Sequence, residues 1–351
     1  MTVTGDPNAT SRLAVRFENV SIVFGDHPER ALPLMDQGQS RGEIQQATGQ
    51  VLGVHNCSLD VAEGEILVLM GLSGSGKSTL LRAVNGLNPV CRGAVHVCDG
   101  NVLVDVTHAD PATLRRIRLH RVAMVFQQFG LLPWRTVREN VGLGLELGGM
   151  SAAERRSRVD AQLALVNLTQ WADRKVGELS GGMQQRVGLA RAFATEAPIL
   201  LMDEPFSALD PLIRAKLQDE LLELQRTLKR TIIFVSHDLD EAFKLGNRIA
   251  LMEGGRIVQC GTAREIIANP ISDYVADFVA HMNPLGVLTA RDVMAPGDAS
   301  GPEVAPETPV KTVMEALKAG AEALVVAEHG RRLGVIRATD VLGRLLDPRH
   351  G

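Results

Sequence analysis

The chain has few cysteines and no long apolar run, and both shortages limit what it can be. Its four cysteines, Cys57, Cys91, Cys98 and Cys260, form no C-x-x-C pair and have no histidine cluster near them. Zinc is therefore not expected, and the thiols are predicted to be reduced. No apolar stretch reaches the length of a membrane span, and the N-terminal MTVTGDPNATSR lacks the core of a signal peptide. If the protein works at a membrane, other chains are expected to supply the spanning helices.

An excess of positive charge is also missing. The 37 lysines and arginines stand against 41 aspartates and glutamates, giving a formal net charge of −4. A nucleic-acid partner is therefore not expected. The length of 351 residues fits a large domain followed by a small one.

What the chain does contain is a glycine-rich loop between an apolar strand and a helix. Residues 65–70 (EILVLM) predict a buried strand, and residues 79–86 predict the opening of a helix. The intervening GLSGSGKS fits the G-x-x-x-x-G-K-S pattern of a phosphate-binding loop. Lys77 would reach the β- and γ-phosphates, and the Ser78 hydroxyl would bind Mg²⁺. The nucleotide-binding residues expected here are Gly71, Ser73, Gly74, Ser75, Gly76, Lys77, Ser78 and Thr79.

A second apolar strand, residues 199–202, ends in two adjacent carboxylates. Because neighbouring strand residues point to opposite faces, Asp203 and Glu204 cannot share one role. Asp203 is placed to hold Mg²⁺, and Glu204 is placed to polarise an attacking water as general base. A third apolar strand, residues 231–235, precedes His237, for which a γ-phosphate contact is expected.

Between these motifs lies LSGGMQQRVGLARA, residues 179–192, which predicts a helix capped by Ser180 with Gly181 and Gly182 in its first turn. Such a bare helix end, with its positive dipole, suits a second phosphate contact. The segment resembles the signature motif of ATP-binding cassette (ABC) ATPases, and the resemblance covers about residues 13–280. The family commonly has Gln where this chain has Met183, which we interpret as a subfamily mark.

The resemblance implies further roles. Gln127 matches the Q-loop glutamine, which binds Mg²⁺ and senses the transmembrane partner, and Asp210 matches the end of the D-loop. His237 matches the switch histidine. Phe24 stands where the family places an aromatic ring against adenine, with an ordinary core phenylalanine as the alternative.

The family also implies ATP and Mg²⁺ as ligands. Ser78, Gln127 and Asp203 would hold the metal, while Lys77, Glu204 and His237 would act in catalysis. Two chains would pair head to tail, so that Ser180, Gly181 and Gly182 of one chain touch the γ-phosphate held by the other.

Residues 26–53 form a segment that a plain cassette lacks. It is polar, and its amphipathic part around residues 41–48 has a surface helix as its plain interpretation. The segment resembles the insert that marks the ATPases of glycine betaine, proline betaine and choline importers. The implied α/β fold spans residues 13–282, with a mixed core sheet, an antiparallel β subdomain and a helical signature subdomain at about 128–180. The alternation of residues 13–23 predicts an edge strand, and residues 1–12 are expected to be disordered.

The tail has a different pattern. Residues 283–309 are rich in proline and glycine and predict a linker. Residues 310–347 resemble one cystathionine-β-synthase (CBS) repeat, a small α+β module that normally packs in pairs. This lone repeat would pair with the tail of a second subunit or be a degenerate remnant.

Taken together, the resemblance implies the ATP-hydrolysing subunit of an ABC importer. It would work as a homodimer under transmembrane permease subunits, at the cytoplasmic face of the bacterial inner membrane. A periplasmic or lipid-anchored binding protein would deliver the substrate. Leu131, Leu132 and Trp134 would either dock the permease or pack within the helical subdomain. Because the tail carries one repeat, choline is the expected substrate, with glycine betaine or proline betaine, or less readily an amino-acid-type substrate, as alternatives.

Overall fold

The computed structural model describes residues 12–280 and 287–346. The described chain divides into two compact units. The first reaches to His237 and includes Met252–Ile257, and the second holds the remaining described residues. The expected disorder of residues 1–12 lies outside the described residues, except at Arg12. Among the described helices, none has the length and apolar character needed to cross a membrane.

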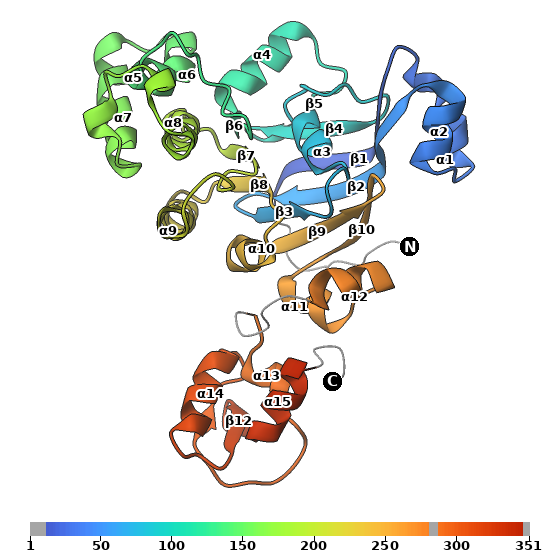
Figure 1. Cartoon of the computed structure of the whole chain (residues 1–351), viewed down its shortest axis with the longest axis vertical. Coiled ribbons are helices and arrows are strands. Elements are labelled where there is room, and N and C mark those ends of the chain that lie inside the picture. Colours follow the sequence, from blue (N-terminus) through green and yellow to red (C-terminus); the bar gives the residue numbers. More distant parts are fainter. Residues whose placement is uncertain (1–11, 281–286, 347–351) are drawn as a thin grey trace. The chain divides into compact units, whose positions relative to one another are not determined.

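A four-stranded antiparallel sheet with the order β2-β1-β4-β5 forms one layer of the first unit (Figure 1). Strand β1 is therefore an interior strand, and the expectation of an edge strand is wrong. The alternation of apolar and polar residues predicts which face of the strand is buried, and it does not predict how many strands pair with it. Bulges interrupt the pairing of β1 with both of its neighbours. The strands are β1 (Leu13–Phe24), β2 (Val51–Ala62), β4 (Arg92–Asp99) and β5 (Val102–Asp105).

The core sheet has the order β10-β9-β3-β8-β7-β6. Strands β3, β8, β7 and β6 run parallel to one another, and β3, β7 and β8 are buried along their whole length. Their carboxyl ends therefore meet at one edge of the sheet, where open α/β sheets bind ligands. The strands are β3 (Ile66–Met70), β6 (Val122–Val125), β7 (Ile199–Asp203), β8 (Thr231–Val235), β9 (Arg248–Glu253) and β10 (Arg256–Gly261).

Helices α5, α6 and α7 pack on the signature helix α8, which in turn contacts β6 (Figure 1). Short 3₁₀ turns lie at Thr169–Trp171 and Val176–Glu178. The helices that follow the insert are α3 (Lys77–Ala83), α4 (Pro111–His120), α5 (Val137–Val141), α6 (Leu143–Leu147), α7 (Ala152–Leu165), α8 (Gly181–Ala194), α9 (Pro211–Leu228), α10 (Leu239–Leu245), α11 (Ala263–Ala268) and α12 (Asp273–Ala280).

The insert folds as a 3₁₀ turn (Pro28–Arg30) and two helices, α1 (Leu32–Asp36) and α2 (Arg41–Thr48). It is more than a surface helix, because it has a small core of its own on the antiparallel sheet. That core consists of Val23, Ala31, Met35, Ile44 and Leu52. Residues 51–53 belong to β2, so the extra segment ends three residues earlier than expected.

The tail builds a three-stranded sheet, β11-β12-β13, with its own core. Leu288, Ala290 and Val293 are buried in that core, and β11 pairs in parallel with β12. The described part of the expected linker, residues 287–309, thus belongs partly to the module, because buried apolar side chains lie between its prolines and glycines. The elements are α13 (Ala290–Val293), β11 (Glu303–Val304), α14 (Val310–Lys318), β12 (Leu324–Glu328), β13 (Arg331–Ile336) and α15 (Ala338–Leu346).

The small core of the insert predicts how tightly α2 is held. Ile44 has 0% of its side chain exposed, so Ile44→Ala should lower the free energy of local opening of the insert by about 2 kcal/mol or more. Hydrogen exchange of the α2 amides measures this. The control is Gln46→Ala, at an exposed position on the same helix, which should change the free energy of local opening by less than about 0.5 kcal/mol. Equal protection in both variants would show that Ile44 does not anchor the helix.

Candidate active site

The phosphate loop is shaped by glycines that no larger residue can replace. Gly71 and Gly76 have φ of 141° and 101°, which side chains rarely adopt. A Cβ at Gly71 would lie 2.1 Å from the carbonyl oxygen of Met252, and one at Gly76 would lie 2.6 Å from that of Gly53. The loop therefore packs so closely against the backbone of Met252 and Gly53 that neither position has room for a side chain.

Lys77 is buried within this loop. Its ammonium donates to the carbonyl oxygens of Gly71 and Leu72, both at 2.9 Å. Burial lowers the pKa of Lys77, while the carboxylates of Glu204 and Asp203 act in the opposite direction. A phosphate in the cradle would give this ammonium the direct counter-ion that the loop carbonyls do not supply.

Asp203 is fully buried behind the loop, with 0% of its side chain exposed. The Ser78 hydroxyl donates to one carboxylate oxygen at 2.6 Å, and Arg82 donates to the other at 2.8 Å. Ser78 and Arg82 are four residues apart on α3 and so lie on one face of the helix. Arg82 is not among the residues predicted from the sequence, although its spacing of four from Ser78 places it on the same helix face.

Glu204 sits at the end of β7 with its carboxylate between two other predicted residues. Gln127 Nε2 donates to Glu204 Oε2 at 3.0 Å, and His237 Nδ1 lies 3.7 Å from the same oxygen. Glu204 has φ of 49°, an uncommon value for a residue with a side chain. Buried Gln185 of α8 donates to its backbone carbonyl at 3.2 Å, which ties the signature helix to the end of β7.

These groups border one cavity of about 720 Å³. Phe24 lies in its wall with 39% exposure, so it is not an ordinary core residue. Two residues of the insert, Arg41 and Gln45, also line the cavity and were not predicted. The predicted residues that line it are Phe24, Gly71, Ser73, Gly74, Gly76, Lys77, Ser78, Thr79, Gln127, Glu204 and His237.

The remaining predicted residues lie elsewhere. Ser75 and Asp203 are buried beside the cavity and do not line it. Ser180 caps α8 and, like Gly181, is exposed, while Asp210 caps α9. None of Ser180, Gly181, Gly182 and Asp210 lines the cavity of its own chain.

The donors near the cavity suit Mg²⁺ bound together with phosphate. In the described chain, no three histidine, cysteine, aspartate or glutamate side chains gather to hold a metal by themselves. The Ser78 hydroxyl, the Asp203 carboxylate and the Gln127 amide are instead oxygen donors of the kind that Mg²⁺ prefers when substrate phosphates complete its shell.

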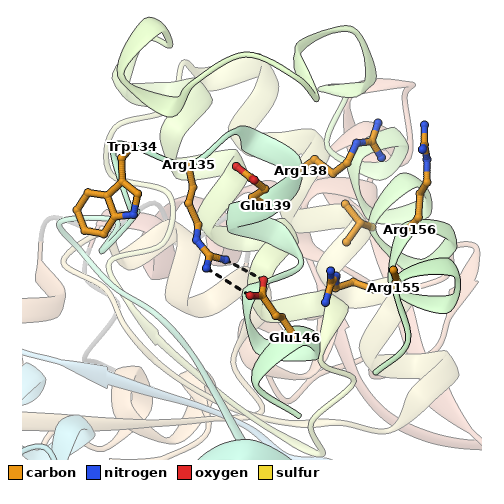
Figure 2. Close-up of a pocket in the computed structure, with 9 residues that line it drawn as sticks. Trp134, Arg135, Arg138, Glu139, Glu146, Arg155 and Arg156 are labelled. Carbon is orange, nitrogen blue, oxygen red and sulfur yellow. Dashed lines mark hydrogen bonds and ion pairs between the residues drawn. The ribbon is translucent and has the colours of Figure 1, made fainter. Parts of the chain in front are cut away.

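A second cavity, of about 620 Å³, lies within the helical group α5–α7 (Figure 2). Trp134 at its rim is 68% exposed, and Leu131 and Leu132 are partly buried. Arg135 forms an ion pair with Glu146 at 2.8 Å. Arg155 and Arg156 of α7 also line the cavity, and the charge of Arg155 contributes to lowering the pKa of Glu146.

Comparison with known proteins agrees with this geometry. The family model described as ABC transporter matches residues 54–207, and the model described as CBS domain matches residues 302–347. The Escherichia coli glycine betaine/proline betaine transport ATP-binding protein ProV is 50% identical over 80% of this chain and 70% of its own length. The Bacillus subtilis glycine betaine transport ATP-binding protein OpuAA is 44% identical over 93% of this chain and 77% of its own. The chain belongs to the ABC ATP-binding subunits of the glycine betaine, proline betaine and choline transport family.

A solved structure supports the fold of this ABC subunit. The dimeric ATP-binding cassette MJ0796, bound to ADP and phosphate, superposes with a TM-score of 0.61 and 32% identity. It covers 71% of this chain and 98% of its own. The subunit is thus an ABC ATPase coupled to transport, with the expected mixed sheet, antiparallel sheet and helical group, followed by a small CBS module.

The contact between Arg82 and the buried Asp203 can be tested by substitution. Arg82→Ala leaves one oxygen of a buried carboxylate without its charged partner, so we expect a loss of stability of about 1–3 kcal/mol. Thermal unfolding measures that loss, and steady-state ATPase assays should show a lower kcat. Arg82→Lys, which keeps the charge, should recover part of both. Unchanged stability and activity in Arg82→Ala would show that Ser78 alone suffices to hold Asp203.

Proposed function

We propose that this ABC subunit powers the import of a betaine, glycine betaine or proline betaine, rather than choline. The observation that supports this is the extent of similarity. The betaine-named relatives match 80% and 93% of this chain, whereas the Bacillus subtilis choline transport ATP-binding protein OpuBA matches 64% at 42% identity. The match with OpuAA includes most of the chain that follows the cassette, so the lone CBS module is no argument for choline.

For hydrolysis, the residues in and beside the cavity are assigned the following tasks. Glu204 accepts a proton from the water that attacks the γ-phosphate, and its contact with Gln127 orients its carboxylate. Lys77 contacts the β- and γ-phosphates, and His237 contacts the γ-phosphate. Phe24 stacks on adenine. Ser78, Asp203 and Gln127 hold Mg²⁺, which neutralises phosphate charge when bound.

A second copy of the chain completes this site. The exposed N-terminus of α8, with Ser180, Gly181 and Gly182, is proposed to cover the γ-phosphate held by the other chain. Asp210 belongs to the loop at the same interface. This arrangement makes hydrolysis depend on dimerisation, because neither chain can supply both halves of one site.

The other proposed partners are the permease subunits and, through them, a periplasmic or lipid-anchored substrate-binding protein. The α5–α7 cavity is the proposed permease contact, since it combines the exposed indole of Trp134 with the arginines Arg155 and Arg156 (Figure 2). The subunit would then lie at the cytoplasmic face of the inner membrane.

The general-base assignment predicts a separation of binding from turnover. Glu204→Gln should keep ATP affinity within about threefold and lower kcat by about 100-fold or more, because the amide cannot accept the proton. Equilibrium ATP binding and steady-state phosphate release measure the two effects. The exposed Glu223→Gln on α9 should retain normal kcat. Near-normal turnover in Glu204→Gln would remove Glu204 as the base.

The substrate assignment is tested by uptake. Cells lacking the gene should lose uptake of radiolabelled glycine betaine or proline betaine, and the wild-type gene should restore it while Glu204→Gln should not. Loss of choline uptake alone would show that the betaine assignment is wrong. Unchanged uptake of all three compounds would reject the whole substrate class while leaving the ATPase assignment intact.

A further inference from the structure

The insert reaches the phosphate loop through one side chain. Arg41, the first residue of α2, lines the nucleotide cavity. Its Nη1 donates to the carbonyl oxygen of Gly74, in the middle of the phosphate loop, and its Nη2 donates to that of Gly53 at 2.6 Å. A cationic group from outside the cassette motifs thus lies against the loop that binds phosphate.

The charge of Arg41 has no counter-charge in the described chain. No carboxylate pairs with it, and its Nε is buried without a hydrogen-bond partner. Burial lowers the pKa of Arg41, and no nearby carboxylate opposes that effect. By contrast, Arg92, which also touches the insert, binds both oxygens of Asp36 at 2.8 and 2.9 Å. A half-buried guanidinium without an anion is unfavourable unless a ligand supplies one.

The backbone holds Arg41 at this position in advance. Ser40 and Glu43 form a capping box at the start of α2, and Gly49 closes the helix with φ of 71°. Ile44, on the next turn, is buried in the core of the insert. Because the helix is fixed at both ends and in the middle, the guanidinium does not have to be recruited when nucleotide arrives.

From these contacts we propose that Arg41 binds the polyphosphate of ATP, as a second cationic contact beside Lys77. The five N–H donors of a guanidinium allow two carbonyl bonds and a phosphate contact at once. The proposal rests on ATP being the ligand of the cavity. It makes the insert a part of the nucleotide site, so that a segment outside the cassette motifs sets the affinity of this subunit for nucleotide.

The test is equilibrium binding to the full chain in the Glu204→Gln background, so that ATP is not consumed. A fluorescent ATP analogue is displaced by ATP, ADP, AMP and adenosine. The variants are Arg41→Ala, Arg41→Lys and the matched control Arg30→Ala, which removes an exposed arginine from the same insert. A further variant, Ile44→Ala, shows how loosening the insert alone changes the affinity for each ligand.

For Arg41→Ala we expect about tenfold weaker binding of ATP and ADP, a smaller loss for AMP and none for adenosine. Arg41→Lys should restore part of the loss, and Arg30→Ala should stay within about twofold. If Arg41→Ala weakened the binding of all four ligands equally, as Ile44→Ala would if it only loosened the insert, Arg41 would be a structural tether and the proposal would be overturned. Unchanged ATP affinity in Arg41→Ala would overturn it as well. Failure of the parent chain to bind ATP would instead contradict the ATPase assignment.

Discussion

The carboxylate of Asp203 is the constraint on which the site depends. It has no exposed surface, so both of its oxygens need partners, and Ser78 and Arg82 supply them from one face of α3. These two bonds fix the helix that follows the phosphate loop against the strand that ends in Glu204. The positions of the phosphate cradle and of the general-base candidate are therefore set by one buried charge.

A second constraint acts on Glu204 from the other side. The residue adopts a left-handed backbone conformation, and its carbonyl is held by Gln185 of the signature helix. Gln185 also accepts a hydrogen bond at 3.2 Å from the backbone N–H of Ala208, two residues before Asp210. One buried amide thus couples the helix that would face the second chain to the carboxylate that faces the first chain's cavity. In the proposed dimer, contact of the second chain with α8 would thus reach the proposed general base through Gln185 alone.

Much of this site could be predicted because its chemistry lies in local motifs. The strand–loop–helix around Lys77 and the strands that end at Asp203 and His237 are short and contiguous, and parallel pairing then brings their ends together. Arg41 could not be predicted, because only the three-dimensional path of the insert carries it to Gly74. Two predictions, that β1 is an edge strand and that the chain before residue 310 is only a linker, were wrong for a related reason. Local composition predicts neither the number of strands that pair with β1 nor the burial of Leu288, because both depend on residues distant in the sequence.

The insert bears on nucleotide binding and not on recognition of the transported substrate. A cassette does not touch the transported molecule, so no residue of its cavity can select a quaternary amine. The insert can instead act on the step that all importers of this kind share, the binding of ATP. Arg41 lies where such an effect would be transmitted, because its two carbonyl contacts join the phosphate loop to the start of β2. Any movement of the insert would then alter the phosphate cradle directly, through hydrogen bonds to its backbone, without a change in the catalytic residues themselves.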